Sequence, residues 1–312
     1  MKTKLLTLFI SCAFSSTILA AIYKMPAPGD DIIGHNSIIT VKRGDTFNKL
    51  REKYGVSFHE LEEANPNVNP YRLRLNQEIL VPNQYILPKY RDGIVINTVE
   101  LRLYYFTKDG YVYTTPVGLG RSGWRTPTTA TSVRDKQANP IWRIPKSIAE
   151  HVLKTKGELL PEFIEPGPDN PLGKYAIYLN KPGYLIHGTN APHTVGKYYS
   201  SGCIRLKADA IEYLFEHVDL GTPVHLIHHA NKVGWLHNEL YLECHEPVSH
   251  DEKPSDLNYT PIDSLIKNIQ KNHDVAIDWQ RIYSIEEKKN GIPEIIGYAR
   301  DHSANDFGTN IY

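Results

Sequence analysis

A chain of 312 residues, 41% of them hydrophobic, is long enough to bury a core in each of two or three domains. Its 35 basic and 35 acidic residues balance, which excludes the basic surface of a nucleic-acid-binding protein, so no nucleic-acid partner is expected. Twenty tyrosines and 21 prolines favour strands and turns over a helical bundle. Composition leaves the oligomeric state open.

The first residues, 1–21, are predicted to be a secretory signal peptide. Two lysines form a short basic start, residues 5–19 are mostly apolar, and two alanines at 20–21 provide a small-residue cleavage site. The apolar stretch is shorter than a helix that spans a bilayer comfortably. An uncleaved membrane anchor and a lipoprotein acylated at Cys12 are the alternatives. We therefore expect an exported protein.

A small unit with the order strand, helix, helix, strand is predicted for residues 37–82. It follows residues 22–36, which show no periodicity and are expected to be an irregular lead-in. The first predicted helix has an apolar face and ends at Gly55, a residue that suits the left-handed end of a helix. Ser57 and Glu60 have the spacing of a capping box, so they predict the start of a second helix.

Residues 91–230 are predicted to form a mainly β domain with short helices. Apolar and β-branched runs indicate its strands, and two stretches have helical spacing. The predicted strands are 94–97, 101–106, 111–116, 141–144, 175–179, 184–187 and 224–227, and the predicted helices are 147–156 and 208–218. Residues 118–129 and 161–171 are expected to be loops.

The remaining residues, 231–312, are expected to be a C-terminal appendage. Alternating residues at 239–244 predict a strand, and residues 249–260 read as a polar linker. Residues 262–269 have the spacing of an amphipathic helix, and residues 292–298 predict a last strand.

Only two cysteines, Cys203 and Cys244, remain after removal of the signal peptide. An oxidising compartment favours a disulfide between them, whereas the alternating pattern around Cys244 favours a strand side chain packed in a core. His225, His228 and His229 have no carboxylate or cysteine partner at suitable spacing, so we expect no metal.

The candidate catalytic residues cluster around one histidine and one cysteine. His187 ends a predicted strand, and Cys203 follows a short loop later, next to Gly202. A thiol nucleophile needs a nearby base, and the N–H groups of Gly202 and Cys203 would stabilise an oxyanion. Arg205 is a candidate for binding a substrate carboxylate. From these residues alone, a catalytic pair and a buried structural thiol both remain open.

The same motifs resemble the signature of the YkuD family of L,D-transpeptidases, in its periplasmic Gram-negative branch. The signature residues are His187-Gly188-Thr189 and Ser200-Ser201-Gly202-Cys203-Ile204-Arg205. Further runs that agree with this branch are residues 93–97, 101–105, 166–173 and 184–190. The resemblance implies a catalytic domain with a mixed β sandwich or barrel fold.

The unit at 37–82 resembles a LysM module, which binds N-acetylglucosamine-containing glycans. The resemblance rests on residues 41–46, 63–66 and 75–82. Phe47 stands where tryptophan or isoleucine is often found. A structural cap without a ligand is the alternative.

The resemblance to the L,D-transpeptidases also implies roles for single residues. Cys203 would be the nucleophile, and His187 the base and acid, held by a backbone carbonyl near Gly188. The implied orienting and oxyanion-stabilising residues are Gly202, Gly188 and Ser201, and the implied substrate-binding residues are Arg205, Thr189 and Tyr199. The family commonly has a histidine at Ser201, whose hydroxyl can only donate or accept a hydrogen bond.

The implied reaction is acyl transfer on peptidoglycan in the periplasm, without a cofactor or metal. Cys203 would attack a tetrapeptide stem, release D-Ala, and pass the acyl group to a diaminopimelate amine in a 3→3 cross-link or to a lysine of an envelope lipoprotein. An L,D-carboxypeptidase or lipoprotein-releasing amidase on the same fold is one alternative. A non-catalytic peptidoglycan-binding protein is the other.

Overall fold

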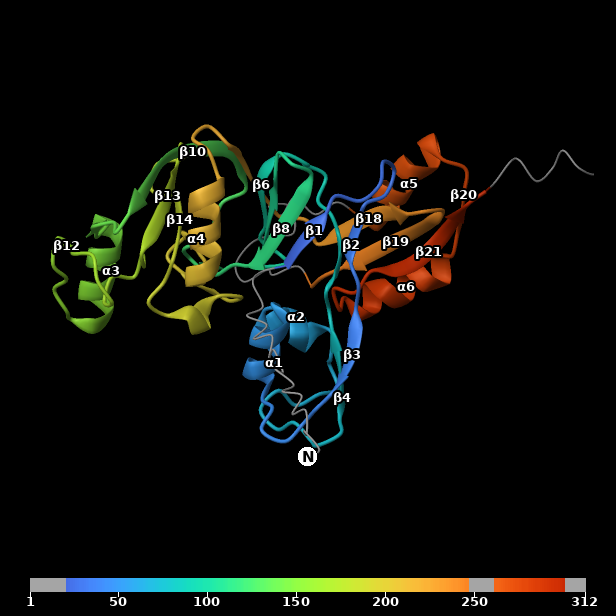
Figure 1. Cartoon of the computed structure of the whole chain (residues 1–312), viewed down its shortest axis with the longest axis horizontal. Helices are drawn as coiled ribbons and strands as arrows, with labels where there is room; N and C mark the ends of the chain where they lie inside the picture. The colour runs from blue at the N-terminus through green and yellow to red at the C-terminus, as the bar shows by residue number, and fades with distance from the viewer. Residues whose placement is uncertain (1–20, 247–260, 301–312) are drawn as a thin grey trace, which may run out of the picture.

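The structure is a computed structural model that describes residues 21–246 and 261–300. It has three parts: a central curled sheet, an N-terminal module (residues 37–82) below it, and a C-terminal sheet beside it (Figure 1). Residues 1–20 of the predicted signal peptide and the predicted linker at 249–260 lie outside the described residues. None of the described helices combines the length and the apolar character that crossing a membrane requires.

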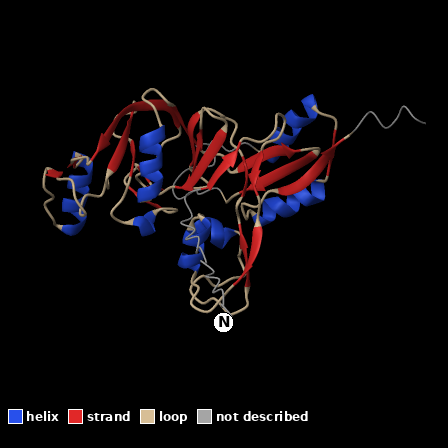
Figure 2. Ribbon diagram, viewed as in Figure 1, coloured by secondary structure: helices blue, strands red, loops and turns tan. Residues whose placement is uncertain are grey.

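The central sheet has nine strands, in the order β1-β8-β7-β6-β17-β10-β13-β14-β16. It is mostly antiparallel, and its two parallel pairs are β6 with β17 and β14 with β16. The strands are β1 (Ala21–Lys24), β6 (Gly93–Asn97), β7 (Arg102–Phe106), β8 (Tyr111–Pro116), β10 (Thr129–Ala138), β13 (Tyr175–Leu179), β14 (Leu185–His187), β16 (Ile204–Arg205) and β17 (Pro223–Ile227). The mainly β fold predicted for this domain is confirmed (Figure 2).

Both faces of the central sheet are buried at β7. Leu103 and Tyr105 belong to one hydrophobic core, and Tyr104 and Phe106, which alternate with them, belong to a second. The helix α4 (Ala208–His217) packs in the first core through Ala210, Ile211 and Leu214. Shorter elements of this domain are β9 (Leu119–Gly120), β11 (Trp142–Arg143), β12 (Phe163–Ile164), β15 (Tyr198–Ser200), the helix α3 (Lys146–Lys156) and a 3-10 turn, η1 (Pro192–Thr194).

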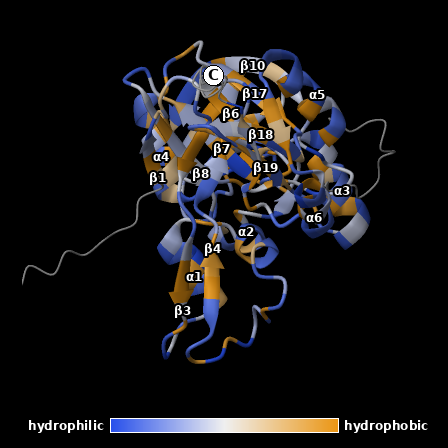
Figure 3. Cartoon of the chain, turned by 90° about the vertical axis from the view of Figure 1, so that its right-hand side faces the viewer, coloured by the Kyte–Doolittle hydropathy of each residue, from blue (hydrophilic) through white to orange (hydrophobic). Residues whose placement is uncertain are grey.

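The N-terminal module has the predicted order: β3 (Ser37–Thr40), α1 (Phe47–Tyr54), α2 (Phe58–Glu63) and β4 (Glu78–Val81). Gly55 ends α1 in the left-handed conformation, and Ser57 and Glu60 form the predicted capping box. Phe47 lies in the core of the module. The antiparallel pair of β3 and β4 carries apolar residues on both strands (Figure 3).

Before residue 140, one prediction is wrong and one strand was missed. Residues 22–36 are not irregular, because β1 pairs with β8 and β2 (Ile32–Gly34) pairs with β5 (Gln84–Ile86). The strand β10 was not predicted either. Of its ten residues only Val133 is fully buried, so its sequence lacks an apolar pattern, and pairing with β13 and β17 defines it instead.

The C-terminal part is a four-stranded sheet with two helices. Its strand order is β18 (Asn231–Leu236), β19 (Glu239–Cys244), β21 (Glu294–Ala299) and β20 (Val275–Ile277). The helices α5 (Ile262–Asn272) and α6 (Trp279–Lys288) pack on one face, where Cys244 lies in the core, as predicted for that side chain. Neither β18, β20 nor α6 was predicted from the sequence.

Candidate active site

One face of the central sheet is partly covered by α3 and β11. A cavity of about 740 Å³ opens on this face. Of the predicted site residues, His187, Cys203, Arg205 and Ser201 line it. The other lining residues are Trp124, Arg134, Gln137, Ile141, Trp142, Arg143, Pro145, Ser147, Ile148, Pro171, Leu172, Tyr178, Leu179, Gly183, Tyr184, Leu185 and Ser200.

The register of β14 and β16 brings the histidine and the cysteine together. In this parallel pair Ile186 lies opposite Ile204, and His187 opposite Arg205. Both isoleucines are in the hydrophobic core, so the side chains on either side of them project to the opposite face of the sheet. Cys203 directly precedes β16, and it therefore lies diagonally across from His187 on the cavity side.

Cys203 is held at the end of a tight turn. Gly202 has a φ of +107°, a value that favours glycine, and a Cβ there would be 3.2 Å from the ring of Tyr184. The hydroxyl of Ser200 accepts a hydrogen bond from the Gly202 N–H at 3.1 Å and donates one to the Cys203 carbonyl at 2.6 Å. Thr126 Oγ1 donates to the Gly202 carbonyl at 2.9 Å. The turn thus has a fixed shape.

This turn changes the expected set of oxyanion donors. Because the Gly202 N–H is bonded to Ser200, it points to the turn, and the Cys203 N–H remains the candidate donor. Ser201 Oγ accepts a hydrogen bond from Arg121 Nη1 at 3.3 Å. Sequence reasoning assigned no role to Ser200, although it lies inside the quoted motif.

The buried imidazole of His187 is oriented by backbone. Its Nδ1 lies 2.6 Å from the carbonyl oxygen of Gly188, as predicted. Burial, with the charge of Arg205 as the next cause, lowers the pKa of His187 to about 4, while hydrogen bonds to backbone carbonyls oppose this shift. The ring is therefore neutral at pH 7, and because the Gly188 carbonyl accepts from Nδ1, the unprotonated nitrogen is Nε2.

The thiol of Cys203 is also neutral at rest. Its Sγ lies 3.6 Å from the Gly183 carbonyl oxygen. Burial raises the pKa of Cys203, and a backbone hydrogen bond at Leu185 and the charge of Arg205 oppose that rise. A neutral thiol can act as a nucleophile only when a base removes its proton, and the neutral imidazole of His187 in the same cavity is the candidate base.

The loop at 166–173 supplies backbone carbonyls to His187, those of Pro171 and Leu172. Asn170 is fully buried, and its amide donates hydrogen bonds to the carbonyls of Pro140, Ile164 and Glu165. Its Oδ1 accepts from the N–H of Leu172 at 2.9 Å. Asn170 therefore positions the carbonyls of this loop that face His187. The sequence signal for Asn170 was its place in the run 166–173, but no role was assigned to it.

Three residues were predicted to bind substrate. Of these, only Arg205 belongs to the described lining of the cavity. Its Nη1 lies 3.3 Å from Thr194 Oγ1, and its guanidinium lies over the ring of Tyr199, 5.7 Å from the centroid. Tyr199 is 54% exposed and lies on the outer side of Arg205. The hydroxyl of Thr189 accepts from the Ala191 N–H, so it stabilises a turn.

Both cysteines are free, which leaves the alternative of a Cys203–Cys244 disulfide without support in this structure. Cys244 is 1% exposed within the C-terminal core, whereas Cys203 faces the cavity.

Two of the three histidines near residue 227 contact oxygen atoms of other residues. His225 contacts Asp92 at 3.4 Å, and His228 Nδ1 contacts Thr98 Oγ1 at 2.7 Å.

One cluster in the described residues has the composition of a metal site. Glu100, Glu243 and His245 are buried, with ligand atoms within 4.8 Å of one another. The ammonium of Lys232 lies 2.8 Å from Glu100 and 2.7 Å from Glu243. A lysine therefore already supplies the positive charge that these carboxylates require.

The cavity contains a thiol, a neutral imidazole and a guanidinium. This combination is typical of enzymes that transfer acyl groups through a cysteine. The comparisons with known proteins agree. Residues 91–226 match the YkuD family model, the L,D-transpeptidase catalytic domain, and residues 39–82 match the LysM domain. The N-terminal module is thus a LysM domain.

The chain belongs to the L,D-transpeptidase family. It is 36% identical over 291 residues to "Probable L,D-transpeptidase ErfK/SrfK" of Salmonella typhimurium, which covers 90% of this chain and 93% of that protein. It is 37% identical over 262 residues to "Probable L,D-transpeptidase YbiS" of Escherichia coli K12, covering 81% and 85% respectively. The solved catalytic domain of the Enterococcus faecium L,D-transpeptidase aligns with a TM-score of 0.34 at 19% identity, covering 45% of this chain and 100% of that one.

Proposed function

We propose that this enzyme acts in the periplasm on peptidoglycan, with Cys203 as nucleophile and a tetrapeptide stem as acyl donor. The acceptor is an amine, either of a second diaminopimelate or of a lipoprotein lysine. The observation that carries the proposal is the placement of Cys203, His187 and Arg205 on one face of the sheet, in one cavity.

In the first half-reaction, His187 Nε2 takes the proton of the Cys203 thiol while the sulfur attacks the carbonyl at the L-centre of diaminopimelate. The Cys203 N–H stabilises the oxyanion. The C–N bond to D-Ala then breaks, and His187 returns the proton to the leaving amine. The products are free D-Ala and a thioester on Cys203.

In the second half-reaction, the acceptor amine attacks the thioester carbonyl and loses a proton to His187. The C–S bond breaks, and the sulfur recovers a proton from His187. A new amide forms and the thiol is restored. Because the thioester conserves the energy of the bond it replaces, the reaction requires no ATP.

The charge of the cavity supports an anionic donor. Its described lining includes Arg134, Arg143 and Arg205 but neither Asp nor Glu. Arg134 sits at a bulge in β10, between Val133 and Asp135, and its guanidinium lies 5.9 Å from the centroid of the Tyr178 ring. Bulges redirect side chains next to active sites, and guanidinium groups bind carboxylates in two-point contacts. A peptide stem carries several carboxylates.

Product analysis tests the proposal. Mature protein is incubated with disaccharide-tetrapeptide, with and without a peptide that ends in lysine, and the products are read by mass spectrometry. Cross-linked dimers or peptide-tailed stems that require Cys203 support a transpeptidase and identify its acceptor. Tripeptide stems alone would replace the proposal with an L,D-carboxypeptidase, and an unchanged substrate would favour a binding protein.

A further inference from the structure

The LysM domain packs directly on the loop that leads to Cys203. Gly196 lies in this loop with a φ of +79°, and a Cβ there would be 2.5 Å from the Cβ of Ser57, the residue that caps α2. The next residue, Lys197, places its ammonium 5.7 Å from the centroid of the Phe58 ring. Gly196 and Ser57 are both buried. The contact leaves no room for even one additional carbon atom.

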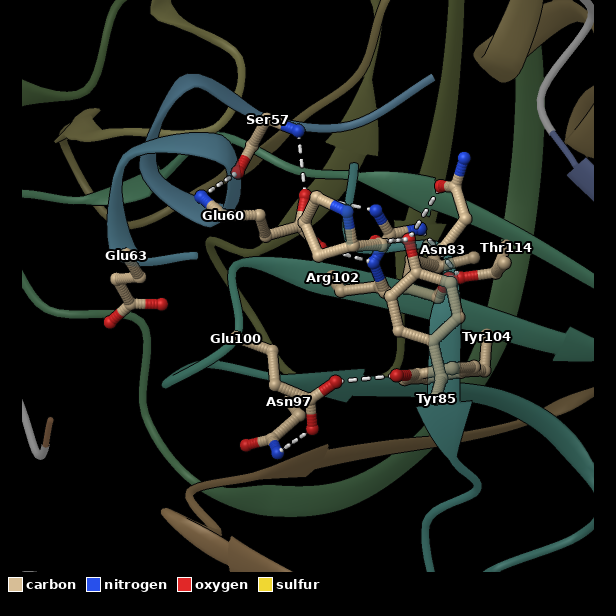
Figure 4. A network of polar contacts seen from close by, with 12 residues as sticks. Ser57, Glu60, Glu63, Asn83, Tyr85, Asn97, Glu100, Arg102, Tyr104 and Thr114 are labelled. Atoms are coloured by element: carbon tan, nitrogen blue, oxygen red, sulfur yellow. Dashed lines mark hydrogen bonds and ion pairs between the residues drawn. The ribbon is translucent and has the colours of Figure 1, made fainter. Parts of the chain in front are cut away.

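The same end of α2 is fixed to the central sheet by a buried ion pair. Glu60 receives two hydrogen bonds from Arg102 of β7, from Nε at 2.5 Å and from Nη2 at 2.9 Å. The carboxylate also accepts the N–H of Ser57 at 2.6 Å (Figure 4). Arg102 is 1% exposed and Glu60 is 6% exposed. One carboxylate therefore closes the capping box and attaches α2 to the catalytic domain.

The guanidinium of Arg102 is enclosed by the catalytic domain and the LysM domain together. Its Nη1 donates to Thr114 Oγ1 at 3.1 Å, and its Cζ lies 4.2 Å from the centroid of the Tyr85 ring. Burial opposes the charge of Arg102, but the Glu60 carboxylate outweighs burial, so the pKa of Arg102 is raised. Arg102 therefore stays charged at the contact between the two domains.

From Gly196 the contact continues to the nucleophile through backbone bonds. The Gly196 N–H donates to the Val117 carbonyl at 3.0 Å, and the Lys197 carbonyl accepts from the Leu119 N–H at 3.0 Å. The loop then forms β15, which pairs with β9 and ends at Ser200. Ser200 is the residue whose hydroxyl holds the Gly202–Cys203 turn.

We propose that the LysM domain is a structural part of the active site, in which Ser57 and Glu60 act as positioning residues for Cys203. Glu60 holds Ser57 in place, and the contact of Ser57 with Gly196 sets the position of β15. In turn, β15 sets the turn that presents the thiol to His187. The role is independent of any glycan that the LysM domain binds, and it concerns thiol reactivity, so it does not rest on the acceptor proposed above.

The test is the rate at which iodoacetamide alkylates Cys203, measured against pH in the full-length mature protein. Peptide mass spectrometry assigns the adduct to Cys203 rather than Cys244. Gly196→Ala adds the methyl group that meets Ser57. Gly55→Ala is the matched control, since Gly55 has a similar φ of +67° in the LysM domain but nothing within 4 Å of its Cβ. Gly196→Ala/Ser57→Gly removes the opposing atom, and glycine still serves as an N-cap.

The proposal predicts alkylation about tenfold slower in Gly196→Ala, because small displacements of a reacting group have large effects on rate. The rate in Gly55→Ala stays near the wild-type value, and the double variant recovers most of the loss. With peptidoglycan substrate, kcat falls while KM changes little. A rate in Gly196→Ala equal to that of Gly55→Ala overturns the proposal, whatever either variant does to Tm.

A second pair of variants decides the matter if Gly196→Ala does not fold. Glu60→Gln removes the charge that holds Arg102 without changing the loop, and Glu62→Gln alters an exposed carboxylate on the same helix. The proposal predicts slower alkylation of Cys203 in folded Glu60→Gln and an unchanged rate in Glu62→Gln. Equal rates in the two variants overturn it.

Discussion

His187 lies directly opposite Arg205 across the parallel pair β14–β16, and this places a fixed positive charge beside the imidazole. Burial and this charge together lower the pKa of His187 to about 4. The same guanidinium opposes the rise in the pKa of Cys203 that burial causes. Arg205 therefore favours the proton distribution that the proposed attack requires, an unprotonated imidazole and a thiol that can lose its proton.

The pH dependence of the reaction follows from this pair. The base must be neutral, so kcat/KM for the acyl donor should fall as pH decreases through the pKa of His187, with a midpoint near 4 rather than at the ordinary value of 6.5. Arg205→Gln should move this midpoint to higher pH, because it removes a cause of the lowered pKa. An acid limb near 6.5 in the wild type, or one unmoved by Arg205→Gln, would contradict the assignment.

Ser200→Ala should lower kcat by roughly 30-fold, since the turn would lose both hydrogen bonds of the hydroxyl, each is worth roughly 1 kcal/mol, and about 1.4 kcal/mol is tenfold in rate. KM should change little, because the arginines that line the cavity are untouched. Ser264→Ala, at an exposed position on α5, is the control. Steady-state kinetics measure both variants, and equal kcat values would show that Ser200 does not hold the turn.

Lys232→Met should destabilise the protein by about 3–5 kcal/mol, because it leaves Glu100 and Glu243 buried beside each other without their ammonium partner. Urea denaturation measures the free energy of unfolding. Lys108→Met is the matched control: its ion pair with Asp219 is exposed, so its loss should have no measurable effect. A similar loss of unfolding free energy in both variants would mean that burial of the Lys232 ion pairs does not determine how much they stabilise the protein.

Arg134→Gln should raise KM for a tetrapeptide donor by about tenfold with kcat nearly unchanged, as expected when a contact that is equal in the ground and transition states is lost. A donor with amidated carboxylates should no longer distinguish the variant from the wild type. Lys154→Gln, an exposed charge removed from α3 outside the cavity lining, is the control. A KM for Arg134→Gln equal to that of the control would contradict the proposed carboxylate site.

The sequence predicted those parts of the molecule that depend on neighbouring residues. The capping box of Ser57 and Glu60, the left-handed Gly55 and the core position of Cys244 follow from local spacing, and the structure confirms them. The closeness of His187 and Cys203 could be predicted because one short loop separates them and the motif is specific.

What the sequence did not predict depends on partners far along the chain. The strand β1 forms by pairing with the edge strand β8. The strand β10 can be polar because its pairing with neighbouring strands, and not burial of its side chains, stabilises it. Glu60 and Arg102 are 42 positions apart, and no pattern links them. The engagement of the Gly202 N–H could not be foreseen either, because it depends on how the hydroxyl of Ser200 is oriented.

The central claim is that Cys203 carries the acyl group, and the mass of the intact protein tests it most directly. Mature wild-type protein and Cys203→Ala are each mixed with disaccharide-tetrapeptide donor, quenched in acid within seconds, and weighed by mass spectrometry. The account predicts a wild-type adduct equal to the donor minus D-Ala, removed by hydroxylamine as a thioester is, and no adduct in folded Cys203→Ala. An adduct or D-Ala release that persists in Cys203→Ala would contradict it.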